Sequence, residues 1–155
     1  MTERTRPITI LMAEDDEDDR MLTRDAFSEC RLSNELRFVE DGEELMDYLK
    51  RRDRYADPAS APTPGLILLD LNMPKKDGRE ALAEIKADPE LRRIPVVVLT
   101  TSNAEEDILR SYDIGVSSFI VKPVTFESLV VLLQTLHQYW FEIVEPSPLA
   151  AEAAS

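Results

Sequence analysis

One short stretch, Leu66 to Pro74, constrains the fold of this chain more than any other. Four apolar residues follow Gly65 and run directly into Asp70. A continuous apolar run between turn residues is typical of a strand that is buried on both faces, as in the middle of a parallel sheet. The strand is therefore expected to end at Asp70, at the carboxyl edge where open parallel sheets bind ligands. Taken alone, a carboxylate in that position fits the capping of a turn equally well.

The rest of the chain repeats this pattern of a short apolar run followed by a segment with helical spacing. We expect strands at residues 8–13, 36–39, 66–70, 94–99 and 118–121, and helices around residues 21–27, 45–49, 81–85, 104–114 and 126–140. Strands that alternate with helices pair in parallel, and their right-handed crossovers cover both faces of the sheet. The chain is therefore predicted to be an α/β protein with a doubly wound, five-stranded parallel sheet in the flavodoxin-like order 2-1-3-4-5.

The length of 155 residues fits a single domain, to which we assign residues 1–145. Residues 53–65 carry three prolines and are predicted to form a loop, which is long for a connection in a compact α/β domain. Residues 146–155 begin Pro-Ser-Pro and continue with an alanine-rich run, so we expect a disordered tail there.

The charge of the chain restricts its partners. A net charge of −13 argues against direct binding of nucleic acid, which needs a basic face. The sequence has no apolar run long enough to cross a bilayer and no apolar leader at its N-terminus. Its single cysteine, Cys30, cannot form an intramolecular disulfide. These features favour a cytoplasmic protein with no membrane contact.

Polar residues stand at the ends of four of the five expected strands. They are Glu14 and Asp15, Asp70, Thr100 and Lys122. Acids after the first strand also suit the start of a helix, so each position alone has an ordinary structural explanation. That explanation would require four separate coincidences at one edge of the sheet. Three carboxylates packed together repel one another, and a hard divalent cation such as Mg²⁺, which prefers oxygen ligands, relieves the repulsion.

The residue types at this edge suit phosphoryl transfer. Asp70 is a nucleophile that can take a phosphoryl group as an acyl phosphate. The ammonium of Lys122 and a bound cation offset the charge on the phosphoryl oxygens, and the hydroxyl of Thr100 donates a hydrogen bond to one of them. The sequence contains neither Gly-x-Gly-x-x-Gly nor a Walker motif, so a bound nucleotide is not expected to carry the phosphate.

This set of residues resembles the receiver domain of two-component response regulators over about residues 7–140. The resemblance rests on Glu14-Asp15, Asp70, Met73-Pro74, Asp77-Gly78, Thr100 and Lys122-Pro123. It implies that Asp70 is the phosphoacceptor for a histidine kinase and that Mg²⁺ is the cofactor. It further implies that Asp15 and Asp70 bind the metal directly, that Asn72 binds it through its backbone carbonyl, and that Glu14 acts through a bound water.

A narrower resemblance is to the small single-domain regulators that pair with bacterial phytochromes. It rests on the long segment at residues 53–65, the run at residues 72–78 and the sequence at residues 139–142. Two positions depart from the usual receiver pattern. Phe119 occupies the place of the switch aromatic and has no hydroxyl, and Thr101 is bulkier than the usual small residue, which would slow attack on the phosphoryl group.

Two other functions use some of the same residue types. An aspartyl-phosphate hydrolase of the haloacid dehalogenase type also uses a strand-end aspartate with Mg²⁺, but it needs a second acid two positions on, where this chain has Asn72. A degenerate interaction module that is never phosphorylated is the other alternative, although every acceptor-site residue type is present. Since no separate output domain is expected, the signal would pass by direct contact to a downstream protein that the sequence does not identify.

The final helix is richer in apolar residues than one buried stripe requires. Its core stripe is expected to include Phe126, Leu129, Val130, Leu133, Leu136 and Trp140. Val131, Leu132, Tyr139 and Ile143 fall outside that stripe, and Leu109 lies off the buried face of the helix before it. Because monomers seldom expose a large apolar patch, we expect a homodimer with twofold symmetry. The alternative is that residues 139–144 fold back onto their own domain.

Overall fold

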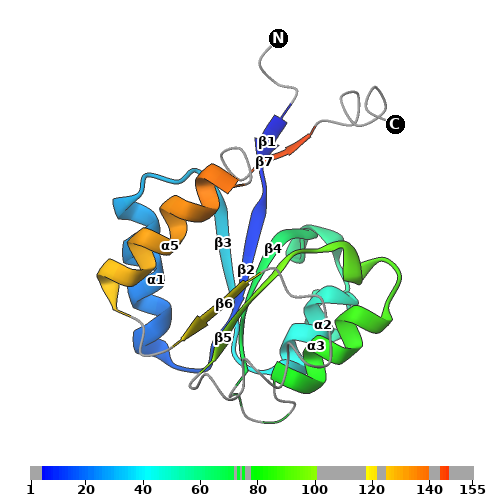
Figure 1. Cartoon of the computed structure of the whole chain (residues 1–155). Coiled ribbons are helices and arrows are strands. Elements are labelled where there is room, and N and C mark those ends of the chain that lie inside the picture. The colour runs from blue at the N-terminus through cyan, green and yellow to red at the C-terminus, as the bar shows by residue number, and fades with distance from the viewer. Residues whose placement is uncertain are drawn as a thin grey trace.

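The computed structural model describes residues 5–71, 73, 75, 78–100, 118–121, 125–139 and 144–146. Its main sheet contains β2 (Thr9–Ala13), β3 (Glu35–Val39), β4 (Pro64–Asp70), β5 (Val96–Thr100) and β6 (Ser118–Val121). These strands run in the order β3-β2-β4-β5-β6, and every neighbouring pair is parallel (Figure 1). The parallel α/β sheet and the predicted order of its first four strands are confirmed, and β6 pairs with β5 at the edge.

Helices cover both faces of this sheet (Figure 1). α1 (Glu17–Glu29) and α5 (Phe126–Tyr139) pack together on one face, and α2 (Gly42–Leu49) and α3 (Gly78–Ala87) lie on the other. A short 3₁₀ turn, η3 (Leu91–Arg93), precedes β5. The helix expected at residues 104–114 lies outside the described residues. No helix in the described part of the chain is both long and apolar enough to cross a membrane.

The apolar run of β4 forms the centre of the core. Leu66 and Leu68 pack with the side chains under α1 and α5, whereas Ile67 and Leu69 pack with those under α2 and α3. Successive side chains of a strand point to opposite faces, so a strand covered on both sides must be apolar at every position. The four side chains are at most 1% exposed, and burying each contributes roughly 1.5–3 kcal/mol.

Residues 53–65 are more regular than the predicted loop. They contain two 3₁₀ turns, η1 (Asp53–Tyr55) and η2 (Pro58–Ser60), and β4 already begins at Pro64. Three donors from the neighbouring elements bond to backbone carbonyls of this segment: Arg37 Nη1 to Ser60 at 2.8 Å, Tyr48 Oη to Pro62 at 2.8 Å, and Arg51 Nε to Ala61 at 3.2 Å. The predicted loop therefore contains two short 3₁₀ turns, its last two residues belong to β4, and the three side chains hold it against the domain.

A second, two-stranded sheet was not foreseen. β1 (Thr5–Pro7) and β7 (Val144–Pro146) pair antiparallel, near the amino end of β2 and away from the carboxyl edge (Figure 1). The pairing joins residues 144–146 to the N-terminal strand, and residues 140–143, which the fold-back alternative concerned, lie outside the described residues. Pro146 ends β7, and residues 147–155 lie outside the described residues.

α5 exposes fewer apolar side chains than its sequence predicted. Leu132 is only 9% exposed and packs in the core under α1 and α5, so the prediction that it faces outward was wrong. Val131 is 61% exposed, as expected of a residue outside the buried stripe. Leu129 and Leu133 are buried, as predicted for that stripe.

Candidate functional site

Three carboxylates meet where β2 and β4 end. Glu14 and Asp15 directly follow the last residue of β2, and Asp70 is the last residue of β4. Because β2 and β4 are parallel neighbours, their carboxyl ends open onto the same edge. One carboxylate oxygen from each of the three residues lies within 4.8 Å of the other two. The cluster predicted from the strand ends is therefore assembled in the structure.

The cluster lies at the topological switch point of the sheet. β2 has β3 on one side and β4 on the other, so the chain order reverses there, and crevices of this kind bind ligands in open α/β sheets. Glu14 and Asp70 are buried, at 0% and 2% exposure, whereas Asp15 is exposed. The site thus has two carboxylates at its floor and one at its mouth.

The turn that carries Glu14 and Asp15 is bonded at several points. The backbone N–H of Glu14 donates to the carbonyl of Val39 at 2.9 Å, and its carbonyl accepts from Arg20 Nη1 at 2.7 Å. Its side-chain Oε2 accepts from the backbone N–H of Asp16 at 3.2 Å. Asp16 is the N-cap of α1, as expected for acids at a helix start, so the turn leads directly into the helix.

The other side of the site depends on Gly78, the first residue of α3. Its backbone N–H donates to the carbonyl of Leu71 at 3.0 Å. A Cβ at this position would lie 2.4 Å from the backbone oxygen of Asp70 and 2.5 Å from the Cα of Leu71. The sequence marked Gly78 only as a turn residue after Asp77. The structure shows that the helix can approach the end of β4 only because this residue has no side chain.

The donor set fits a hard divalent cation. Carboxylate oxygens are the ligands that Mg²⁺ prefers, and at bonds of about 2.1 Å two ligands on one ion are at most about 4.2 Å apart. Oxygens within 4.8 Å of one another need only a small adjustment to share an ion. Carboxylates that lie this close together repel one another when ionised, and a divalent cation relieves that repulsion.

The remaining predicted site residues are placed by the backbone alone or not at all. Thr100 is the last residue of β5 and pairs with Val121, the last residue of β6. The sheet therefore brings Thr100 and the residue before Lys122 to the same edge as the three carboxylates. Asn72 and Lys122 themselves lie outside the described residues.

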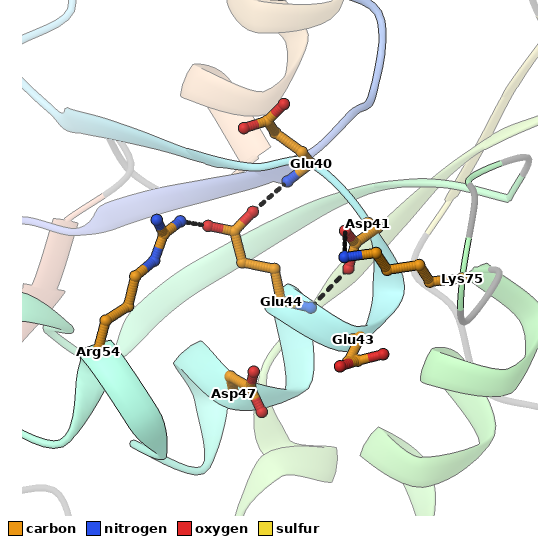
Figure 2. A pocket seen from close by; sticks show the side chains of 7 residues that line it. All are labelled: Glu40, Asp41, Glu43, Glu44, Asp47, Arg54 and Lys75. Atoms are coloured by element: carbon orange, nitrogen blue, oxygen red, sulfur yellow. Dashed lines mark hydrogen bonds and ion pairs between the residues drawn. The ribbon is translucent and has the colours of Figure 1, made fainter.

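A polar hollow of about 360 Å³ lies at the N-terminus of α2 (Figure 2). It is lined by Glu40, Asp41, Glu43, Glu44, Asp47, Arg54 and Lys75. Lys75, which follows Asp70 along the chain, extends its ammonium to within 3.8 Å of Asp41 Oδ2. This hollow was not predicted from the sequence, although an aspartate followed three residues later by a glutamate is a recognisable helix-start pattern.

Glu44 joins the start of α2 to the segment at residues 53–65. Its carboxylate accepts from the backbone N–H of Glu40 at 2.7 Å and pairs with Arg54 (Figure 2). It also accepts from the hydroxyl of Tyr55 at 2.6 Å. The ring of Tyr55 in turn packs against Tyr48, with centroids 5.1 Å apart. The Glu44 carboxylate is surrounded by hydrogen-bond donors and a guanidinium. Its contacts therefore stabilise the packing of residues 53–65 against α2.

The fold and the cluster together define a class: a doubly wound α/β protein with a carboxylate cluster, of a kind that can hold a cation, at its switch point. Comparison with known families specifies it further. The model of the response regulator receiver domain matches residues 10–134. The chain therefore belongs to the response regulator receiver family, which is not a family of conventional enzymes.

Relatives of known structure include phytochrome response regulators. Response regulator Rcp1 of Synechocystis sp. (strain ATCC 27184 / PCC 6803 / Kazusa) is 42% identical over 138 residues, which cover 89% of this chain and 92% of Rcp1. The crystal structure of its Mn²⁺-bound form matches with a TM-score of 0.75 at 41% identity, over 90% of this chain and 99% of that one. The crystal structure of the phosphorylated cyanobacterial phytochrome response regulator RcpA matches with a TM-score of 0.76 at 44% identity, over 88% of this chain and 95% of that one.

A bacteriophytochrome response regulator, RtBRR, matches with a TM-score of 0.77 at 39% identity, over 96% of this chain and 89% of that one. The similarity covers nearly the whole length of each of these proteins. This chain is thus closely related to the regulators of both cyanobacterial phytochromes and bacteriophytochromes.

Proposed function

We propose that this protein is a single-domain response regulator that accepts a phosphoryl group on Asp70 from a histidine kinase. The observation that carries the proposal is the cluster of Glu14, Asp15 and Asp70 at the switch point. Asp70 ends the central strand, so its carboxylate is held at a fixed position on the edge of the sheet. The receiver-family match supports the same role.

In the proposed reaction a carboxylate oxygen of Asp70 attacks the phosphorus atom. An oxygen–phosphorus bond forms, the nitrogen–phosphorus bond to the kinase histidine breaks, and the imidazole leaves. Mg²⁺ held by Asp15, Asp70 and the backbone carbonyl of Asn72, with Glu14 acting through a water, would supply positive charge at the phosphoryl oxygens. Thr100 is proposed to donate a hydrogen bond to one of these oxygens and Lys122 to contact another.

We propose that the full sheet has the flavodoxin-like strand order 2-1-3-4-5, in which β6 is the edge strand and leads to Lys122. The pairing of β6 with β5 supports this order. The signal is proposed to be a change of conformation in which Thr100 moves toward the new phosphoryl group and Phe119 turns inward. States that differ by a few kcal/mol suffice for such a switch.

We propose a phytochrome-type photoreceptor kinase as the phosphoryl donor, a proposal supported by the similarity to Rcp1 and RcpA. We also propose a cytoplasmic location and a homodimer that uses the outer face of α5. The exposure of Val131 supports the dimer. Sedimentation at micromolar concentration tests it: a monomer of 17.6 kDa both with and without phosphorylation would contradict it.

The phosphoacceptor is tested by intact-protein mass after incubation with acetyl phosphate and Mg²⁺. The wild type and the surface variant Asp25→Asn should gain one phosphoryl group, and Asp70→Asn should gain none while keeping its circular dichroism spectrum. A gain at the wild-type level in Asp70→Asn would refute the assignment. Rapid release of phosphate would favour a hydrolase instead, and no labelling of the wild type would favour a non-phosphorylated interaction module.

A further inference from the structure

Arg20 has an unusual position for a cation. It lies near the N-terminus of α1, directly after the acids Glu17, Asp18 and Asp19 of the first turn. The helix macrodipole places partial positive charge at this end, so it favours those acids and disfavours a guanidinium. A contact that compensates for this position is therefore expected.

The compensating contact reaches the carboxylate cluster. Arg20 Nη1 donates a partly buried hydrogen bond of 2.7 Å to the backbone carbonyl of Glu14. The carbonyl belongs to the peptide that joins Glu14 to Asp15, so the guanidinium holds the bond between two members of the cluster. At this length, and with an ionised donor, the bond is of the stronger, charge-assisted kind.

The other bonds of this turn hold the atoms on either side of the peptide, and Arg20 bonds to the peptide carbonyl itself. On one side, the backbone N–H of Glu14 bonds to β3, and its side chain accepts from Asp16. On the other side, the chain enters α1 through the Asp16 cap. Rotation of the Glu14–Asp15 peptide would turn the exposed carboxylate of Asp15 away from Asp70.

We infer that Arg20 is a positioning residue for the divalent-cation site: its guanidinium fixes the Glu14–Asp15 peptide so that both carboxylates face Asp70. The inference rests on the proposed function, because it concerns the proposed Mg²⁺ site. Groups that orient metal ligands from outside the coordination shell typically change metal affinity by about 10- to 100-fold when they are removed.

The sign of the effect separates this role from two simpler ones. If Arg20 only added positive charge near the cluster, its removal would make the binding of a cation tighter. If it only stabilised the helix, its removal would lower the melting temperature and leave the Mg²⁺ affinity of the folded protein unchanged. A positioning role alone predicts weaker binding by a folded protein.

The experiment is a calorimetric titration of the full chain with MgCl₂ at neutral pH, accompanied by thermal melts. Arg20→Met retains the aliphatic stem and loses every donor, whereas Arg20→Lys retains the charge and one donor group. Arg24→Met is the matched control, because Arg24 lies one turn further along α1, is exposed, and contacts the ring of Phe38 instead of the turn. Asp15→Asn reports the loss of a proposed ligand.

Arg20→Met is expected to raise the Mg²⁺ dissociation constant about tenfold, and Arg20→Lys by less. Arg24→Met should stay within about twofold of the wild type, since it removes the same charge without touching the cluster.

Unchanged or tighter binding by Arg20→Met, with Asp15→Asn impaired, would overturn the positioning role and leave the proposed function standing. If the wild type bound no Mg²⁺, both the metal site and this inference would be refuted. If Arg20→Met did not fold, weakened binding by folded Arg20→Lys would support the role, and wild-type affinity would overturn it.

Discussion

Glu14 and Glu44 occupy comparable positions and have opposite surroundings. Each follows closely on a strand of the sheet, and each accepts a backbone N–H near the start of a helix. Glu44 also meets a guanidinium and a phenol, so its charge is offset within the protein. Glu14 lies in a crevice with two further carboxylates.

The difference separates a structural carboxylate from a binding one. Surrounding a carboxylate with donors and a cation stabilises the fold and provides no reason for it to take a ligand. Gathering carboxylates together costs stability in the free protein, because like charges repel, and it creates a site where a divalent cation is favoured. Removing a side chain should therefore have opposite consequences in the two regions.

The largest effect is expected from Asp15→Asn. Loss of one proposed ligand should weaken Mg²⁺ binding by at least about a hundredfold, beyond the range typical of groups outside the coordination shell. The same change should raise the melting temperature of the metal-free protein, because it removes one of three like charges. Titration calorimetry measures the Mg²⁺ affinity, and thermal melts in a chelating buffer measure the melting temperature of the metal-free protein. Asp25→Asn is the control. A lower melting temperature without metal would show that the cluster is not repulsive.

Gly78→Ala should destabilise the protein by about 2–3 kcal/mol, the cost of forcing a methyl group into a packed site. The new Cβ would fall 2.4 Å from the Asp70 backbone oxygen, so α3 or the end of β4 must shift. Urea unfolding measures the loss, and phosphorylation by acetyl phosphate should slow as well. Ala83→Ser, at an exposed position of α3, should remain within about 0.5 kcal/mol of the wild type.

Glu44→Ala should cost about 2 kcal/mol of stability, because it leaves a guanidinium, a phenol and a backbone N–H without their acceptor. Unlike Asp15→Asn, it should leave the Mg²⁺ dissociation constant within about twofold. Glu43→Ala, at the exposed position beside it, should change neither quantity measurably. A loss of Mg²⁺ affinity in Glu44→Ala would mean that the two regions are coupled.

Tyr48→Phe should cost about 1 kcal/mol at neutral pH through loss of its 2.8 Å hydrogen bond to the Pro62 carbonyl. Burial raises the pKa of Tyr48 to about 12, and the charges of Arg37 and Glu35 act on it more weakly and in opposite directions. Since the folded-state pKa is the higher one, the unfolded chain loses this proton near pH 10 while the folded protein keeps it.

The stability contributed by Tyr48 should therefore fall by about 2 kcal/mol as the pH rises from about 10 to about 12. Urea unfolding of the wild type and of Tyr48→Phe at several pH values measures the difference between them. That difference should shrink over this range and then reverse in favour of the variant. A difference that does not depend on pH would refute the raised pKa.

What the sequence determined by itself are the features that depend on neighbours along the chain. Continuous apolar runs such as residues 66–69 indicate buried strands, and helical spacing indicates the faces that cover them. Because parallel strands end at one edge, polar residues at strand ends predicted the cluster of Glu14, Asp15 and Asp70. The acids at the start of α1 were also predicted correctly, since capping is a local interaction.

What only the tertiary structure decided are contacts between segments that no local pattern relates. The pairing of β1 with β7 joins residues about 140 positions apart, and Arg37 bonds to a carbonyl of the predicted loop at residues 53–65. Leu132 packs in the core under α1 and α5, although it was placed outside the buried stripe of the final helix. The need for Gly78 comes from the distance between α3 and the end of β4, a quantity set by packing.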